Sequence, residues 1–414
     1  MANRKAVREA VRKGHVKAGV KPLRALWASN APWGATGYAV QTAQIVERMQ
    51  ADGHEVAIAA NFGLQGCDTE WNGTKIYPAG IAPYSDDILW AHAQHWFSAS
   101  TLPNMVFTLF DVWALKNPSI DQIPRIAAYV PIDHQPGPPE VIQWLRKPNV
   151  MPIAMSQFGS RMLELEKIEH LYAPHAFDGK VFKPTDHFPD AQGKQVTGRD
   201  LMEIPDPDRF VVMINSANKG RTPPRKCWGE NLLAFSVFAQ DKPDAILYLH
   251  TDESAALQGV DLPALIRSCG LRDDQVKIVN QYLYRMNLPQ VALAALYTAA
   301  DVLLCASAGE GFGVPVIEAQ ACGTPVIVSN FTAQPELVGD GWCVDGQPMW
   351  DPNQNSWFFT PFVSQIVRAL EHAYERRGSG KSVEAITFAE QYEADRVYAE
   401  HWRPTLDRLA LWQP

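Results

Sequence analysis

The sequence lacks several patterns that would assign it to other classes of protein. No apolar run approaches the roughly 18–20 residues that cross a bilayer, so we expect no membrane-spanning helix. The six cysteines form no C-x-x-C pair and have no nearby histidine spacing, which favours reduced thiols in the core over a zinc site. A net charge of -8 argues against nonspecific nucleic-acid binding, which clustered positive charge supports. There is also no internal repeat of about 20–50 residues.

The length and composition indicate a globular protein with more than one core. A chain of 414 residues is too long for one ordinary core and fits two α/β domains of about 200 residues each. Hydrophobic residues make up 46% and charged residues 20%, as in folded soluble domains. We predict domains at residues 21–190 and 191–378 and a C-terminal segment at 379–414. The polar region 185–207, which carries Pro and Gly, is the predicted linker.

Residues 1–20 form a basic arm. Six Arg and Lys side chains stand there against a single acid, Glu9. We interpret the arm as a solvated terminus, with attachment to an anionic membrane surface or to an acidic partner as the alternative. Because the arm lacks the apolar core of a secretion signal, we expect a cytoplasmic protein. On the alternative interpretation the protein is peripheral at the inner membrane face.

Residues 301–330, DVLLCASAGEGFGVPVIEAQACGTPVIVSN, predict a strand, a glycine loop, a helix and a second strand. The short apolar run 301–306 is typical of a strand buried on both faces of a parallel sheet. The glycines of 309–313 allow the backbone to approach a ligand. Pro315 suits the first turn of a helix, and 325–329 is the next strand. The loop and the helix start therefore lie at the carboxyl edge of the sheet, where open α/β folds bind ligands.

Two carboxylates indicate which ligand this edge could hold. Glu310 lies in the loop, and Glu318 lies about one turn inside the helix, roughly 5–6 Å further along its axis. The free N–H groups and the dipole of the helix start favour a phosphate between them. A phosphate flanked by two carboxylates that accept from hydroxyls describes a nucleoside diphosphate sugar. One glutamate would bind the sugar hydroxyls and the other the ribose diol.

The spacing of these glutamates in EGFGVPVIE, followed by AQACGTPVIVSN, closely resembles the E-x7-E region of retaining glycosyltransferases of the GT-B fold, family 4. The resemblance implies two Rossmann-like domains facing across a cleft and a C-terminal helix that crosses back to the first domain. It implies a UDP- or GDP-linked sugar as co-substrate, no permanently bound cofactor, and an acceptor hydroxyl on a glycan, lipid or protein. In the loop and helix start it assigns donor contacts to Gly311, Phe312, Gly313 and Val314.

A cluster of cations follows a predicted strand at 209–214. It consists of Lys219, Arg221, Arg225 and Lys226, and such a loop could hold two phosphates, because Arg gives forked hydrogen bonds and Lys a point charge. The resemblance implies that an arginine and a lysine grip the diphosphate. Arg221 and Lys226 fit best by spacing, with Lys219 and Arg225 as alternatives, and a solvated basic loop is the bland interpretation. There is no D-x-D motif on a suitable loop, so we expect no metal.

The first domain carries two weaker matches. A strand at 23–29 precedes a loop that contains Gly34 and Gly37, and the resemblance places a donor phosphate near such a glycine pair. Two residues separate the glycines here, so the sequence does not decide which backbone amide approaches the donor phosphate. The alternative is that this loop is an ordinary turn without a function. After a strand at 125–132, the resemblance implies that Asp133 or His134 contacts the donor sugar or its phosphate. A polar cap on a strand would look the same.

Further along the chain, the signals concern the base and the C-terminal end. Gln281 follows a predicted strand at 276–279, where the family binds the nucleotide base. Residues 362–377 and 382–402 are helical by spacing and are separated by Gly378-Ser379-Gly380.

We therefore predict a retaining glycosyltransferase in which Arg221 and Lys226 stabilise the leaving diphosphate, Glu310 orients the sugar and Glu318 binds the ribose. Two other functions fit the same residues. One is a related sugar-nucleotide epimerase or a phosphorylase, the latter with lysine-bound pyridoxal. The other is a noncatalytic nucleotide-binding partner of a glycosyltransferase complex.

Overall fold

The structure is a computed structural model that describes residue 19 and residues 21–190, 192–220 and 224–414. The basic arm, apart from Gly19, and Arg221 lie outside these residues. The described chain forms two compact units. Unit 1 comprises the chain up to Ile132 together with 136–175 and 394–414, and unit 2 comprises 133–135 and 176–393.

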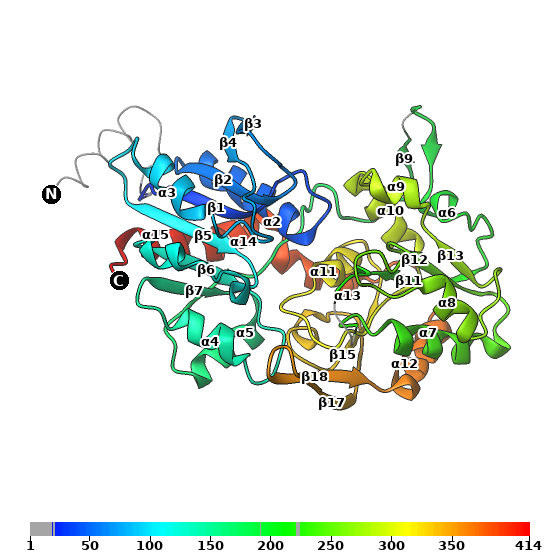
Figure 1. Ribbon diagram of the computed structural model, residues 1–414. Helices are drawn as coiled ribbons and strands as arrows, with labels where there is room; N and C mark the ends of the chain where they lie inside the picture. The colour runs from blue at the N-terminus through cyan, green and yellow to red at the C-terminus, as the bar shows by residue number, and fades with distance from the viewer. Residues whose placement is uncertain (1–18, 20, 191, 221–223) are drawn as a thin grey trace. The chain divides into compact units, whose positions relative to one another are not determined.

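Unit 1 is built on an eight-stranded sheet in the order β3-β4-β2-β1-β5-β6-β7-β8 (Figure 1). Every neighbouring pair is parallel except β3 and β4. The central strands are buried almost without interruption, as parallel strands covered on both faces should be. The strands are β1 (Arg24–Asn30), β2 (Glu55–Phe62), β3 (Thr69–Trp71), β4 (Thr74–Tyr77), β5 (Asn104–Leu109), β6 (Ile126–Val130), β7 (Val150–Ala154) and β8 (Leu171–Tyr172).

Helices connect these strands. Thr36 caps α2, since its hydroxyl accepts a hydrogen bond from the Ala39 amide, and Ser156 caps α5 through the Gly159 amide. The connecting helices of unit 1 are α2 (Gly37–Ala51), α3 (Leu89–Phe97), α4 (Pro139–Leu145) and α5 (Gln157–Leu165), with short 3-10 turns at Val112–Ala114 and Pro118–Gln122.

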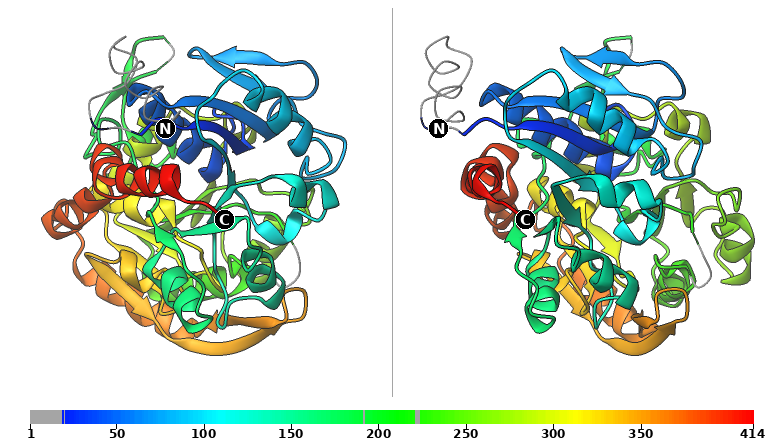
Figure 2. Two further views of the ribbon diagram at one scale, coloured as in Figure 1. Left: turned by 90° about the vertical axis from the view of Figure 1, so that its left-hand side faces the viewer. Right: turned by 60° about the vertical axis from the view of Figure 1, so that its left-hand side comes forward.

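The C-terminal segment also belongs to unit 1. It comprises α14 (Ala394–Val397), a π-helical turn (Tyr398–Trp402) and α15 (Arg403–Leu411), drawn in red beside the sheet of unit 1 in Figure 2. Trp402 is buried, and its ring centroid lies 5.7 Å from that of Trp27 and 4.9 Å from that of Tyr129. Arg403 forms an ion pair with buried Asp52 at 2.7 Å. The expectation that the chain end returns to the first domain is confirmed.

Unit 2 contains a six-stranded parallel sheet in the order β13-β12-β11-β14-β15-β16. Its strands are β11 (Phe210–Asn215), β12 (Ala245–His250), β13 (Val276–Ile278), β14 (Val302–Cys305), β15 (Val326–Ser329) and β16 (Gly341–Val344). Its helices are α6 (Gly198–Leu201), α7 (Trp228–Phe238), α8 (Leu262–Ser268), α9 (Gln281–Arg285), α10 (Gln290–Ala299), α11 (Val314–Ala321), α12 (Val363–Glu375) and α13 (Val383–Ala389). Two antiparallel hairpins, β9 (Phe188–Pro189) with β10 (Gln195–Val196) and β17 (Gly346–Asp351) with β18 (Ser356–Pro361), complete the unit.

The structure differs from the sequence-based expectation at the borders of the units. The single helix expected at 382–402 is interrupted, because Glu393 is extended and bridges to Phe177 where the chain passes from unit 2 to unit 1. Unit 2 begins at Ala176, before the expected linker, since Phe182 is already buried and packs near Tyr297. The hairpin β17–β18 was not expected at all.

Each of the six cysteines is a free thiol. The expectation of core thiols holds for Cys227, Cys305 and Cys322, which are buried, and is wrong for Cys67 and Cys343, which are exposed. In the described part of the chain, no helix is both long and apolar enough to cross a bilayer. The same residues include no group of three or more His, Cys, Asp and Glu side chains that could hold a metal ion.

Candidate functional site in unit 2

The order of the strands creates a place for a ligand in unit 2. The strands β11 and β14 are neighbours at the centre of the sheet, and the chain continues from them to opposite sides. The loops that follow two such strands separate and leave a crevice at the carboxyl edge. The loop after β14 carries Glu310, and the loop after β11 ends in Arg225 and Lys226.

Glu310 lies between these two cations. Its Oε2 accepts a hydrogen bond from Arg225 Nη1 at 2.6 Å, and its Oε1 accepts one from Lys226 Nζ at 2.5 Å. Burial alone would raise the pKa of this carboxyl, but the charges of Arg225 and Lys226 and their hydrogen bonds lower it to about 2. The side chain of Arg225 is still 37% exposed, so part of the guanidinium faces solvent. The arrangement is a fixed pair of cations held by one buried anion.

The backbone of the Glu310 loop is fixed from two sides. A Cβ atom at Gly309 would lie 2.1 Å from the carbonyl oxygen of Asp133, so only glycine allows this close approach. On the other side, the amide of Glu310 donates to Thr332 Oγ1 at 2.9 Å. The Arg225 guanidinium also donates to the Gly309 carbonyl at 2.7 Å. These contacts set the position of the Glu310 carboxylate before any ligand binds.

Glu318 lies in α11 and is buried, as the helix prediction placed it. Its Oε2 accepts a hydrogen bond from the Tyr297 hydroxyl at 3.0 Å, and that hydroxyl accepts one from the Asn215 amide at 2.7 Å. Burial raises the pKa of Glu318 to about 7, and the hydrogen bond from Tyr297 opposes that rise only in part. This carboxyl therefore titrates near neutral pH, whereas Glu310 stays ionised. The two predicted carboxylates differ in charge state because only one of them has cationic partners.

Asp133 and His134 belong to unit 2 and meet the Glu310 loop there. Asp133 Oδ1 contacts His134 Nδ1 at 2.7 Å, and Asp133 Oδ2 lies 3.9 Å from Arg225 Nε. Burial would raise the pKa of Asp133, but the hydrogen bond and charge of His134 and the charge of Arg225 lower it. His134 is buried and its other ring nitrogen, Nε2, lies 3.3 Å from an oxygen of Asp351.

The residues predicted to contact the donor from the glycine loop and the helix start lie at the beginning of α11. Phe312 is buried against Tyr392, which leaves only its backbone for a ligand, and Gly311 is buried beside it. Gly313 has a φ of +135° and precedes Val314, the first residue of α11.

Two other predicted residues lie in neighbouring loops of unit 2. Lys219 is exposed in the loop after β11. The side chain of Gln281 is occupied inside the unit, because its amide donates to the carbonyls of Thr251 and Val279 and accepts from the Glu253 amide. Both N–H donors of that amide are therefore used, and Gln281 could bind a base without losing one of these bonds only by accepting at the second lone pair of its Oε1.

Gly34 and Gly37 lie in unit 1, in the loop between β1 and α2. A Cβ atom at Gly34 would lie 3.2 Å from the Ala31 carbonyl oxygen, whereas one at Gly37 would meet nothing within 4 Å. Arg221 lies outside the described residues.

Of the predicted site residues, the structure brings Glu310, Arg225, Lys226, Asp133 and His134 together in one cluster.

Sequence reasoning missed three residues that hold the predicted site residues in place. Tyr297 is one of them, because its hydroxyl donates to Glu318. Thr332 has a φ of +55° and accepts from the Glu310 amide, and no local pattern pointed to it. Asp351 lies in the sequence WDPNQNSW, whose Asp-Pro-Asn turn signal could have indicated a hairpin.

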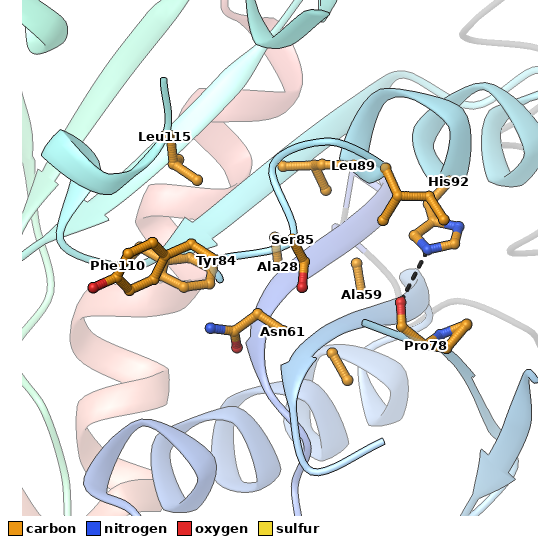
Figure 3. A pocket seen from close by; sticks show the side chains of 12 residues that line it. Ala28, Ala59, Asn61, Pro78, Tyr84, Ser85, Leu89, His92, Phe110 and Leu115 are labelled. Atoms are coloured by element: carbon orange, nitrogen blue, oxygen red, sulfur yellow. Dashed lines mark hydrogen bonds between the residues drawn. The ribbon is translucent and has the colours of Figure 1, made fainter. Parts of the chain in front are cut away.

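Unit 1 has a small pocket of a different kind at the carboxyl ends of β1, β2 and β5. In Figure 3, Tyr84 and Phe110 lie at one end and His92 and Pro78 at the other. Its lining is mainly apolar, but it contains the side chains of Asn61 and Ser85. Among the described residues, no hydrogen-bond partner lies in reach of Asn61 Oδ1 or Ser85 Oγ, although both atoms are buried. Unsatisfied buried oxygens of this kind call for a ligand group or a water.

Comparison with known proteins finds relatives for part of the chain. The family model described as Glycosyl transferases group 1 matches residues 271–372. A stretch of 66 residues is 46% identical to the O-antigen chain mannosyltransferase B of Escherichia coli, over 16% of each protein. A stretch of 141 residues is 30% identical to D-inositol 3-phosphate glycosyltransferase of Mycobacterium leprae, over 34% of this chain and 32% of that protein. These matches span well under two thirds of either relative.

The whole fold matches solved structures. Sucrose-phosphate synthase from Thermosynechococcus elongatus superposes with a TM-score of 0.61 and 17% sequence identity, over 94% of this chain and 96% of that one. The predicted GT-B architecture of two Rossmann-like domains with C-terminal helices is confirmed.

Proposed function

We propose that this chain transfers a sugar from a UDP- or GDP-linked donor to an acceptor hydroxyl with retention of configuration, because residues 271–372 match the family model described as Glycosyl transferases group 1. The observation that carries this proposal is the cluster in which Glu310 holds Arg225 and Lys226 beside the start of α11. Two oriented cations next to the amino end of a helix form a binding site for a diphosphate.

The cations have donors left for a phosphate. Arg has five N–H donors and Lys has three, and Glu310 and the Gly309 carbonyl take only some of them. When the bond between the anomeric carbon and the diphosphate oxygen breaks, negative charge develops on that oxygen, and the fixed cations stabilise it without rearranging. The leaving phosphate then accepts the proton of the attacking hydroxyl. Arg221 stays a predicted additional contact.

The two glutamates take separate roles in this proposal. Glu310 orients the cations and offers its carboxylate to the sugar hydroxyls, and Glu318 accepts from the ribose diol. The buried Tyr297 fixes the Glu318 carboxylate by donating a hydrogen bond to its Oε2. Gly313 and Val314 present backbone amides at the helix start to the phosphate.

The experiment is a turnover assay on the full chain with a panel of nucleoside diphosphate sugars. We expect slow release of UDP or GDP from one donor, and a loss of at least about tenfold in Glu310→Ala and in Lys226→Ala. Glu371→Ala and Lys277→Ala are the matched controls, because each removes the same side chain from elsewhere in unit 2 and should leave turnover unchanged. Normal turnover in both site variants would remove the assignment.

The same assay distinguishes the two alternative functions. A phosphorylase would carry lysine-bound pyridoxal and absorb visible light, and an epimerase would change the sugar without releasing the diphosphate. A noncatalytic partner would bind UDP or GDP without turnover. The glycosyltransferase proposal requires release of the diphosphate together with transfer to an acceptor.

For the acceptor, we propose the pocket of unit 1 shown in Figure 3. Asn61 Oδ1 and Ser85 Oγ supply buried acceptor atoms for a hydroxyl group. The adjacent Tyr84 is 41% exposed and packs edge-on against Trp113, with ring centroids 5.9 Å apart. Aromatic side chains beside polar groups suit the mixed apolar and hydroxylated surface of a sugar ring. The pocket itself has room for little more than one water-sized group, so we propose that a single acceptor hydroxyl enters it and that the sugar ring of a glycan lies outside, beside Tyr84.

A further inference from the structure

The hairpin β17–β18 (Figure 1) has no role in the proposed function. It nevertheless contacts the segments that carry Glu310 and His134 at several points. The amide of Phe359 donates to the Ala308 carbonyl at 3.0 Å, directly before Gly309 and Glu310. The amide of Gln135 donates to the Trp357 carbonyl at 3.2 Å. Phe358 packs in a small buried cluster with Ala308 and Cys227. The hairpin thus contacts both the Glu310 loop and the segment that carries His134.

His134 lies between two carboxylates. Its Nδ1 contacts Asp133 Oδ1 at 2.7 Å, and its Nε2 lies 3.3 Å from Asp351 Oδ2 at the end of β17. The imidazole ring stacks on Phe358 with centroids 3.7 Å apart. His134 is only 2% exposed, and both of its nitrogens face protein oxygens. Its ring could contact a donor sugar only by leaving one of these partners.

Asp351 is held as firmly as His134. Its Oδ1 accepts from the backbone amide and the side-chain amide of Asn353, each at 2.9 Å, and this closes the turn of the hairpin. Its Oδ2 is the atom that faces His134. On the other side of His134, Asp133 Oδ2 lies 3.9 Å from Arg225 Nε. The side chains of Asn353, Asp351, His134, Asp133 and Arg225 therefore form a continuous row of polar contacts from the hairpin turn to Arg225.

We propose that Asp351 and His134 are positioning residues for Arg225: the hairpin fixes His134, His134 orients Asp133, and Asp133 holds the guanidinium towards the leaving diphosphate. The inference rests on the proposed function for the role of Arg225. It gives His134 an indirect role, in place of the direct donor contact that the family resemblance implied. Asp133, whose side chain is 24% exposed, remains the member of the pair that can reach a ligand.

The test uses Asp351→Asn in the full chain. The amide oxygen of this variant can still accept from Asn353 and keep the turn, but its NH2 group cannot accept from His134 Nε2. The control is Asp345→Asn, because exposed Asp345 accepts from Asn330 just before the hairpin and takes no part in the row. Two measurements are made: kcat and KM for the donor that is turned over, and the affinity for inorganic pyrophosphate by calorimetry.

We expect Asp351→Asn to lower kcat at least fivefold and to weaken pyrophosphate binding about threefold, with Asp345→Asn unchanged in both. His134→Gln should give a similar loss. The double variant should be no worse than the more affected single variant, because both changes break the same row. In an Arg225→Lys background, Asp351→Asn should have no further effect on kcat.

The outcomes separate this inference from the proposed function. If donor turnover is present and Asp351→Asn behaves like Asp345→Asn, the positioning role is wrong and the glycosyltransferase proposal stands. If His134→Gln alone is severely impaired and its effect adds to that of Asp351→Asn, His134 contacts the donor directly. If pyrophosphate affinity falls as expected but no donor is turned over, the row is real and the proposed reaction is wrong. Failure to bind pyrophosphate or any donor would overturn both.

Discussion

The two units use the same strand order for different chemistry. Strands β4-β2-β1-β5-β6-β7 of unit 1 and β13-β12-β11-β14-β15-β16 of unit 2 follow the same succession, so both sheets have a crevice at the carboxyl edge beside the central pair. In unit 2 this edge holds charges that satisfy one another. In unit 1 it holds an apolar pocket with the buried oxygens of Asn61 and Ser85.

The difference indicates that topology sets where the crevice lies and that side chains set the chemistry that it offers. Glu310 between Arg225 and Lys226 favours an anion at this edge, because its carboxylate already orients both cations. The pocket of unit 1 has no described ion pair among its lining residues and offers shape and acceptor atoms instead. A donor with a diphosphate suits the first edge, and a neutral hydroxylated acceptor suits the second.

The largest effect should come from removing the charge at the unit 2 edge. Arg225 and Lys226 hold the pKa of the buried Glu310 at about 2, so this carboxylate stabilises the fold above pH about 4.5, and the contribution is lost as the pH falls towards 2. We expect Glu310→Gln to lower the free energy of unfolding by about 3 kcal/mol at pH 7. Urea unfolding of both proteins at several pH values measures the difference.

The pH dependence is the control for this prediction. The difference between Glu310→Gln and the unchanged protein should shrink on acidification, because a protonated Glu310 resembles glutamine. A difference of the same size at pH 7 and at pH 3 would show that the loss comes from packing and not from the ion pairs. The contrast between a charged and an uncharged edge would then lose its energetic basis.

The second effect concerns Glu318, the carboxyl without a cationic partner. Burial raises its pKa to about 7, so the folded protein keeps a proton that the unfolded chain loses above pH about 4.5. Its contribution to stability is complete below pH about 4.5 and is lost as the pH rises to 7 and beyond. We expect a decline of about 2–3 kcal/mol over this range, and Glu318→Gln should remove it. Chemical unfolding of the unchanged protein and of Glu318→Gln at pH 5 and pH 8 measures how the free energy of unfolding of each depends on pH. The same dependence in both proteins would contradict the raised pKa of Glu318.

Much of the unit 2 site could be predicted because its parts are local in sequence. The strand, the glycine loop and the helix that carry Glu310 and Glu318 follow from the alternation of apolar residues, glycines and Pro315 within thirty positions. The GT-B fold followed from the same stretch through its family resemblance. Backbone preferences and helix capping act over a few residues, so one sequence contains them.

The partners of these residues could not be predicted, since they come from distant segments. Glu310 pairs with Arg225 across 85 positions, and His134 meets Asp351 across 217. Spacing alone favoured Arg221, which lies outside the described residues, over Arg225. Which long side chain reaches an ion pair depends on the path of the loop in space, and several cations within eight residues have similar reach. The pocket of unit 1 was missed because its lining residues come from several strands and loops.

A third, smaller effect compares a glycine from each carboxyl-edge loop. A Cβ atom at Gly309 would lie 2.1 Å from the Asp133 carbonyl oxygen, so Gly309→Ala has to displace backbone and should lower the free energy of unfolding by about 1–3 kcal/mol. Gly37, at the start of α2, has open space, and Gly37→Ala should be neutral or stabilise by up to about 1 kcal/mol. Thermal unfolding of the two variants tests the pair. Similar losses would mean that the unit 2 loop is no more tightly enclosed than its counterpart.

The smallest effect on stability is expected at Ser85. Its substitution should change acceptor binding without changing folding. Its buried Oγ has no hydrogen-bond partner among the described residues, so Ser85→Ala should leave the free energy of unfolding unchanged or raise it by up to about 1 kcal/mol. The same change should lower the acceptor-dependent part of diphosphate release severalfold, measured with a panel of methyl glycosides. Donor hydrolysis without acceptor should not change.

The matched control for Ser85 is Ser156, which is also buried in unit 1 but caps α5 by accepting from the Gly159 amide at 3.0 Å. Ser156→Ala should lower the free energy of unfolding by about 1 kcal/mol and leave the response to methyl glycosides unchanged. A stability loss at Ser85 equal to that at Ser156, with no change in the glycoside response, would show that the Ser85 oxygen has a structural partner. The pocket would then not be an acceptor site, and the two carboxyl edges would no longer divide donor from acceptor.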